Sequence, residues 1–211
     1  MLAFIACFCG VLGILVFAEL LWRANVLRGE YQRKFVHVLA GTFFATWPWL
    51  LSWHQIQIMG VLMLVVLGTN NYVDRVLHYG ANLRKKSLGG ICLALAVITC
   101  AFLTHDKVFF SLAILQTSLA DGFAAVFGTR FGKNWGYKAF GQTKTVIGTM
   151  AFWLASVLIL GIGLLSTGSH NYGLLLIFLP PALAAVENIT PLGLDNLTVP
   201  LATLLVLKLA T

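Results

Sequence analysis

The fold is decided by the run from Val108 to Gly128, which reads VFFSLAILQTSLADGFAAVFG. This run is 21 residues long and carries a single charged residue, Asp121. The hydrocarbon core of a bilayer is about 30 Å thick, and a helix of about 20 residues spans it at 1.5 Å per residue. We therefore predict a membrane-spanning helix with one acid inside it.

The composition of the whole chain agrees with a membrane protein. Of its 211 residues, 59% are hydrophobic and 10% are charged, and the mean hydropathy is +0.89. A soluble domain has about 25% charged residues because its surface faces water. Disorder requires low hydrophobicity, and a disulfide-stapled secreted module requires more than four cysteines in a chain of this length. These three classes are therefore excluded.

Eight apolar runs predict an all-α, polytopic helical bundle with about seven or eight transmembrane segments. With no linker or internal repeat to divide it, the chain is predicted to be a single domain over residues 1–211. The first helix, 2–22, would precede the region that carries the polar motifs, 33–200. The predicted segments are 2–22, 35–51, 56–73, 88–104, 108–128, 145–165, 173–187 and 196–211.

Charge placement predicts the orientation of the chain. The first run is followed by basic residues, which places the N-terminus outside. The cytoplasmic connections would then be 23–34, 74–87, 129–144 and 188–195, and they hold 12 of the 14 Lys and Arg residues. The net charge of +7 is thus explained by topology, and no nucleic-acid partner is predicted. The expected location is the cell (inner) membrane, with the polar motifs on its cytoplasmic face.

Asp121 is the first candidate site residue. It would lie about 10 Å inside the cytoplasmic boundary of its helix, on a small polar face with Ser118 and Gly122. A charge at that depth costs about 2.5 to 3.5 kcal/mol on insertion scales, so it is seldom kept without a partner or a site. Close helix packing around a Lys–Asp pair is the structural alternative.

A glycine-punctuated, basic stretch follows this helix. It predicts a cytoplasmic phosphate cradle beside a metal site. The alternative is a helix-packing motif of the G-x-x-x-G kind, because three of its glycines recur at intervals of four. The residues concerned are Gly128, Arg130, Gly132, Lys133, Gly136, Lys144 and Gly148.

The second segment opens with polar residues that enter the membrane together. Lys34, His37 and Gly41 share a helix face. Arg33 and Lys34 could serve only as positive-inside anchors. For His37, general-base catalysis near neutral pH and a positional role remain two alternatives.

Two acid–amide pairs near the C-terminus complete the set. Glu187-Asn188 and Asp195-Asn196 follow Pro180-Pro181, which we expect to break a short helix. Both acids would lie on the same side of the membrane as Asp121. Three carboxylates at one level suit one or two divalent cations.

Four stretches taken together carry a family resemblance. They are R-K-x-x-H-x-x-x-G at 33–41, S-L-A-D-G-x-A-x-x-x-G at 118–128, K-T-x-x-G-T at 144–149 and E-N-x-x-x-x-G-x-D-N-L-x-x-P at 187–200. In order and spacing the chain resembles the CTP-dependent lipid-alcohol kinases, the family of phytol kinase, dolichol kinase and yeast-type diacylglycerol kinase. That family belongs to a wider group of CTP transferases that includes phosphatidate cytidylyltransferase.

The resemblance implies phosphoryl transfer from CTP to a lipid hydroxyl, with Mg²⁺ as cofactor. Asp121, Asp195 and Glu187 would hold the metal and, with His37, form the catalytic group. Phytol, a polyprenol such as dolichol, and diacylglycerol all remain open as substrates, as does the oligomeric state. The implied nucleotide- and phosphate-binding residues are Arg33, Lys34, Ser118, Gly122, Gly128, Arg130, Gly132, Lys133, Lys144, Thr145, Gly148 and Asn196.

Two other functions remain as alternatives. One is cytidylyl transfer to phosphatidic acid, whose branch usually shows a Lys-Asp pair and a His-Gly-Gly run that this chain lacks. The other is a non-enzymatic transporter, because a membrane acid and a proline-interrupted helix also mark transport sites. CDP-alcohol phosphotransferases need further acids at intervals of four, whereas no acid follows Asp121 before Glu187.

Overall fold

The computed structural model describes residues 1–28, 30–68, 88–167 and 172–210, and these residues are mostly helical. In chain order the elements are α1 (Leu2–Arg23), α2 (Glu30–Ala45), α3 (Trp47–Leu50), α4 (Trp53–Gly68), α6 (Gly89–Leu103), α7 (Lys107–Leu115), the π-helix η1 (Gln116–Ala120), α8 (Asp121–Phe131), β1 (Gly136–Ala139), β2 (Gln142–Thr145), α9 (Val146–Thr167), α10 (Tyr172–Ile189) and α11 (Asp195–Ala210).

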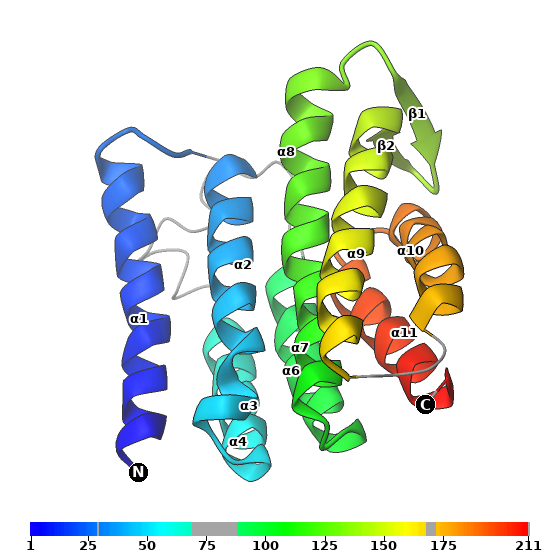
Figure 1. Ribbon diagram of the computed structural model, residues 1–211. Coiled ribbons are helices and arrows are strands. Elements are labelled where there is room, and N and C mark those ends of the chain that lie inside the picture. Colours follow the sequence, from blue (N-terminus) through cyan, green and yellow to red (C-terminus); the bar gives the residue numbers. More distant parts are fainter. Residues whose placement is uncertain (29, 69–87, 168–171, 211) are drawn as a thin grey trace.

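One continuous helical rod, made of α7, η1 and α8, forms the centre of the bundle (Figure 1). Helix α2 packs along this rod, and α1 packs on the outer side of α2. Helix α9 runs beside α8, and α10 and α11 follow on that side of the molecule. Helices α4 and α6 pack against each other, and α6 also contacts α11. The rod therefore brings α2, α9 and α11 around its middle.

Three helical stretches are long and apolar enough to cross a membrane, namely Leu2–Arg23, Lys107–Phe131 and Val146–Leu165. Trp53–Leu67, Gly89–Leu103 and Gly173–Ile189 are apolar but shorter. The predicted run 35–51 is divided into α2 and α3, because Thr46 separates the two helices and Pro48 lies in the first turn of α3. The expected count of seven or eight spans and the outside N-terminus stay predictions.

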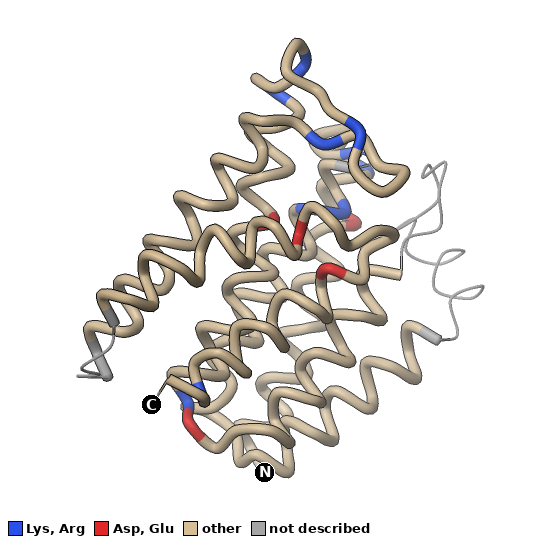
Figure 2. The backbone as a smooth tube through the Cα atoms, turned by 90° about the vertical axis from the view of Figure 1, so that its right-hand side faces the viewer, with Lys and Arg blue, Asp and Glu red and all other residues tan. Residues whose placement is uncertain are grey.

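Basic residues of the described chain gather at the end of the molecule that carries the hairpin β1–β2 (Figure 2). This agrees with the charge asymmetry expected from the sequence. The predicted connection 74–87, with its basic residues Arg75, Arg84, Lys85 and Lys86, lies outside the described residues.

The hairpin corrects the expectation of an all-α chain. Strands β1 and β2 pair antiparallel, with Tyr137 opposite Lys144 and Ala139 opposite Gln142. The connecting residues Phe140 and Gly141 both have positive φ, as a two-residue hairpin turn of this hand requires. The strands alternate little in hydrophobicity and Phe140 is unusual in such a turn, so the sequence gives only a weak hairpin signal.

The expected break at Pro180-Pro181 is wrong. Helix α10 continues through both prolines to Ile189. Two adjacent prolines remove two N–H donors from the helical ladder, but a proline φ near −65° is itself helical, so the chain keeps its path. Glu187 therefore lies near the end of a continuous helix, at a level set by the packing of α10 on α9 and α11.

Candidate active site

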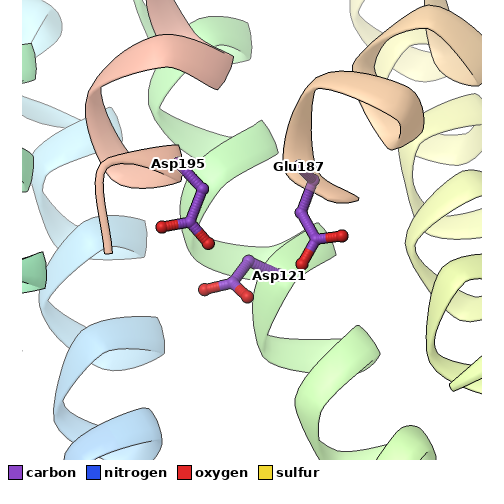
Figure 3. A group of neighbouring side chains, drawn as sticks. All are labelled: Asp121, Glu187 and Asp195. Atoms are coloured by element: carbon purple, nitrogen blue, oxygen red, sulfur yellow. The ribbon is translucent and has the colours of Figure 1, made fainter. Parts of the chain in front are cut away.

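Three carboxylates converge at the centre of the bundle. Asp121 opens α8, Glu187 lies in the last turn of α10, and Asp195 opens α11. One oxygen from each lies within 4.8 Å of the others. Figure 3 shows the three side chains pointing toward one another from separate elements. Asp121 and Glu187 are buried and Asp195 is half-buried. The predicted acidic group is therefore brought together, in an arrangement that suits a divalent cation.

Two lysines neutralise two of these three acids. Lys34 Nζ lies 2.5 Å from Asp121 Oδ2, and Lys144 Nζ pairs with Glu187 Oε1. Burial disfavours the charged form of Lys144, but the Glu187 carboxylate outweighs this effect and raises the pKa of Lys144 above its ordinary value. Lys144 is thus a cation at neutral pH. Both lysines were predicted to bind phosphate, and both lie against the carboxylates.

His37 also contacts Asp121, from α2, one helical turn after Lys34. Its Nε2 lies 2.9 Å from the Thr117 carbonyl oxygen and 3.7 Å from Asp121 Oδ2. When Nε2 carries the ring proton, it donates to Thr117 and faces the acid with the same N–H. The ring is buried. This geometry supports the positional alternative, in which His37 orients Asp121.

Asn196, the residue after Asp195, links α11 to two neighbouring helices. Its Oδ1 accepts a hydrogen bond from Thr117 Oγ1 at 3.0 Å, and its Nδ2 donates to the Gly89 carbonyl at 3.1 Å. The side chain is buried and joins α11 to η1 and α6. These bonds fix the start of α11, where the Asn196 backbone N–H donates to Asp195 Oδ1. A direct nucleotide contact by Asn196 stays a prediction.

Ser118 and Gly122 lie where the rod packs against α2. A Cβ added at Gly41 would collide with the Ser118 side chain, and one added at Gly122 would collide with Val38. The Ser118 hydroxyl donates to the Ile114 carbonyl at 2.9 Å. Small residues here allow α2 to approach closely enough for Lys34 to reach Asp121. The phosphate-binding role predicted for Ser118 and Gly122 is not needed to explain them, and it stays a prediction.

The glycines after Asp121 form a tight contact between α8 and α9. A Cβ at Gly128 would lie 3.3 Å from the Gly148 Cα, and one at Gly148 would lie 3.0 Å from the Ala124 carbonyl oxygen. Thr145 Oγ1 accepts a hydrogen bond from the Gly148 N–H, and it leaves no room for a side chain at Gly132. Of the three glycines at intervals of four, Gly128 therefore fits the helix-packing alternative, with Gly148 of α9 as its partner, while Gly132 packs on Thr145 and Gly136 lies in β1. A phosphate cradle built from them and Thr145 stays a prediction.

The remaining basic candidates are spread around the same end of the molecule. Arg33 is half-buried on α2. Arg130 and Lys133 are exposed beyond the α8–α9 contact, and the Arg130 guanidinium lies 5.5 Å from the Phe131 ring centroid. These three basic residues lie at the same end of the molecule as the three carboxylates. Among the described lysines and arginines, the ion pairs with these carboxylates are made by Lys34 and Lys144.

Sequence reasoning missed several polar residues that position the site. Tyr137, Thr149 and Asn188 form a hydrogen-bonded group beside Glu187. Thr117 supplies its carbonyl to His37 and its hydroxyl to Asn196. A signal existed for Thr149 and Asn188, because Thr149 ends the K-T-x-x-G-T motif and Asn188 directly follows Glu187. Tyr137 had no such signal, since the hairpin that aims it was not predicted.

Comparisons with known proteins point to one kind of enzyme. The chain is 29% identical over 202 residues to a phytol kinase of Synechocystis sp., covering 92% of this chain and 84% of that protein. It is 26% identical to a probable chloroplastic phytol kinase of Triticum aestivum and 25% identical to a second from Glycine max. These alignments cover 89% and 90% of this chain and 70% and 68% of the two relatives.

No family model matches the chain, and no solved structure matches it. The similarity to phytol kinases nevertheless extends over nearly all of its length. It supports an enzyme of the phosphotransferase class, a kinase of the lipid-alcohol kind, in a membrane protein rich in apolar helices.

Proposed function

We propose that this protein is a Mg²⁺- and CTP-dependent kinase that phosphorylates the hydroxyl of a membrane lipid alcohol, with phytol as the first substrate to test. The observation that carries the proposal is the convergence of Asp121, Glu187 and Asp195 from three elements, with a lysine on two of them. The similarity to phytol kinases supports the choice of alcohol. Polyprenols and diacylglycerol are the competing acceptors.

The charges of the site support a metal–phosphate ligand. Three carboxylates and two ammonium groups leave one net negative charge when all five are ionised. A divalent cation would reverse that sign and leave a net positive site, which suits a triphosphate. Mg²⁺ usually binds to one or two carboxylates and to substrate phosphates. The residues present therefore fit this metal.

The chain would contribute mainly positioning and charge. A bound Mg²⁺ would neutralise charge on the phosphoryl oxygens. Lys34 and Lys144 would exchange their carboxylate partners for phosphate oxygens, which keeps both ammonium groups paired throughout. The lipid oxygen would form a new O–P bond as the β,γ-bridging bond breaks and CDP leaves. The hydroxyl proton would pass to Asp195 or His37, the two groups near the cluster without a lysine partner among the described ion pairs.

The location of the site supports a lipid acceptor. The acids lie between helices whose outer faces are rich in exposed apolar residues, which suits contact with lipid, and we propose that the lipid hydroxyl reaches them from the bilayer side. Basic residues gather at the same end of the molecule (Figure 2). We propose that this end faces the cytoplasm, the compartment that supplies CTP, in a multi-pass protein of the cell (inner) membrane.

The test uses the purified protein in lipid nanodiscs with phytol, a polyprenol and diacylglycerol offered together. CTP labelled at the γ-phosphate is compared with CTP labelled at the α-phosphate, with and without EDTA. We expect γ-label in phytyl phosphate, no α-label in any lipid, and no product with EDTA. Label from the α-phosphate in lipid would instead establish cytidylyl transfer. An absence of lipid label from either nucleotide, with Mg²⁺ present, would contradict the kinase.

A further inference from the structure

The hairpin β1–β2 contacts the end of α10 through side chains from one of its faces. Tyr137 and Lys144 are directly opposite each other in the strand register. Lys144 pairs with Glu187, and Tyr137 Oη lies 2.8 Å from Asn188 Oδ1. Two cross-strand neighbours thus contact two consecutive residues of α10. Gln142 extends the contact by donating to the Thr190 carbonyl at 3.0 Å.

Tyr137, Thr149 and Asn188 form a closed group of three hydrogen-bonding side chains. Tyr137 Oη lies 2.6 Å from Thr149 Oγ1, and Thr149 Oγ1 lies 3.2 Å from Asn188 Oδ1. Asn188 Oδ1 can only accept. It therefore accepts from the Tyr137 hydroxyl and from the Thr149 hydroxyl, and either hydroxyl can donate in the contact between Tyr137 and Thr149. The group joins β1, α9 and α10, and the Tyr137 oxygen makes its two shortest contacts.

We infer that Tyr137 is a positioning residue for the metal-binding carboxylate Glu187 and for Lys144; this inference rests on the proposed function. Glu187 lies two residues before the end of α10, where the last carbonyls of a helix have no helical partners. Tyr137 holds the adjacent Asn188 against α9, which fixes the direction in which Glu187 leaves the helix. The same strand pairing places Lys144 opposite that acid.

The position of Thr149 supports the same inference. Thr149 ends the K-T-x-x-G-T motif that begins at Lys144, and its hydroxyl contacts Tyr137 and Asn188. At one end of the motif Lys144 pairs with Glu187. At the other end the Thr149 hydroxyl contacts Tyr137 and Asn188. Because both ends act on consecutive residues of α10, we expect substitutions at Tyr137 and Thr149 to affect the same step.

The experiment replaces Tyr137 by Phe, which removes one oxygen and keeps the ring. We expect the Mg²⁺ concentration for half-maximal phosphorylation to rise about 3- to 10-fold, the size expected when one partly buried hydrogen bond is lost, with a smaller change in maximal turnover. Thr149→Val should behave in the same way, while Thr149→Ser, which keeps the hydroxyl, should restore the wild-type value. Tyr31→Phe is the matched control, because its hydroxyl contacts Thr129 on the exposed surface at 3.4 Å.

A second measurement is independent of catalysis. Mn²⁺ binding to the purified protein in detergent is titrated by the EPR signal of the free ion. We expect weaker Mn²⁺ binding in Tyr137→Phe and unchanged binding in Tyr31→Phe. If wild-type protein fails to phosphorylate any lipid, the proposed function falls, and this titration still tests the positioning role. Unchanged Mn²⁺ affinity and unchanged Mg²⁺ dependence in Tyr137→Phe would overturn the inference, as would equal losses in Thr149→Ser and Thr149→Val.

Discussion

Lys34 Nζ lies 2.5 Å from Asp121 Oδ2, although the two residues are 87 positions apart in the chain. The contact exists because α2 approaches the central rod at Gly41 and Gly122, where no Cβ stands between the helices. Removal of one partner from a buried ion pair costs about 3–5 kcal/mol, because the other charge stays buried alone. Any substitution of Asp121 therefore affects stability as well as chemistry, and the two effects must be separated.

We expect Asp121→Asn to abolish phosphorylation, because an amide keeps the shape of the side chain but loses the charge that binds Mg²⁺. The same change leaves the Lys34 ammonium unneutralised and lowers the melting temperature. The double variant Lys34→Gln/Asp121→Asn removes both charges, so we expect it to recover thermal stability while activity stays absent. Lipid phosphorylation and melting in detergent are the two measurements.

The matched control for this change is Asp106→Asn. Asp106 caps α7 at the start of the rod, away from Asp121 in its middle; its Oδ1 accepts from the Phe109 N–H at 2.9 Å, and Asn serves well as an N-cap. We expect wild-type turnover in this variant. Turnover retained by Asp121→Asn at saturating Mg²⁺ would contradict a metal-binding role for the acid.

Replacement of the two lysines of the hairpin should lower turnover to very different extents. Lys144 lies on the face that contacts Glu187, whereas Lys138 lies opposite Thr143 on the exposed face. We expect Lys144→Ala to lower turnover with CTP by at least about tenfold, because loss of a charge-assisted contact to phosphate costs about 1.5–3 kcal/mol. Lys138→Ala should stay within about twofold of wild type. Steady-state kinetics at several CTP concentrations measure both.

Lys133→Ala completes the comparison, because Lys133 is exposed in the turn between α8 and β1. A loss as large as that of Lys144→Ala would show that the turn also reaches the nucleotide. Equal small losses in all three variants would favour a purely topological role for the basic residues.

Much of the site was predictable because membrane burial makes polar residues conspicuous. Asp121, Glu187 and Asp195 were identified from sequence, since each acid lies within or beside an apolar run and the structure brings them within 4.8 Å. Lys34 and His37 followed from helical spacing, which places residues three or four apart on one face. Both residues do contact Asp121.

The rest depended on long-range packing that no local pattern contains. Glycines at intervals of four are compatible with a phosphate-binding loop or with helix packing, and the approach of α9 to α8, which supports packing at Gly128, cannot be read from the local pattern. The hairpin lacks alternating hydrophobicity, so Tyr137 could not be placed beside Asn188. The two prolines suggested a break, but packing keeps α10 helical through both.

The contact between α8 and α9 provides a stability test. We expect Gly128→Ala to lower the melting temperature, because the new methyl group would lie 2.8 Å from Thr145 Oγ1 and 3.3 Å from the Gly148 backbone. Overpacking of this kind costs about 1–3 kcal/mol. Gly13→Ala in α1 is the control, since a Cβ there has nothing within 4 Å and alanine favours the helix. A Gly128→Ala protein that melts like wild type but binds CTP weakly would instead support the phosphate cradle.

His37 offers the sharpest test of how the site works. Its Nε2 lies near both the Thr117 carbonyl oxygen and the Asp121 carboxylate. An N–H at this nitrogen donates to the backbone and orients the acid. We expect His37→Ala to reduce turnover by about 10²-fold, a loss of the size found for general acid–base groups. His37→Gln keeps an N–H donor of similar reach. If the role is positional, we expect the Gln variant to retain most of the activity.

General-base catalysis by His37 predicts no difference between the two variants, with the Gln variant as inactive as the Ala variant, because an amide does not accept a proton near neutral pH. The Mg²⁺ dependence separates the two roles further. A ring that orients Asp121 should, when removed, raise the Mg²⁺ concentration needed for half-maximal turnover, whereas loss of a base should lower maximal turnover at every Mg²⁺ concentration. Should His37→Gln match wild type in both respects, Asp195 becomes the acceptor of the lipid hydroxyl proton, because it completes the carboxylate group without a lysine partner among the described ion pairs.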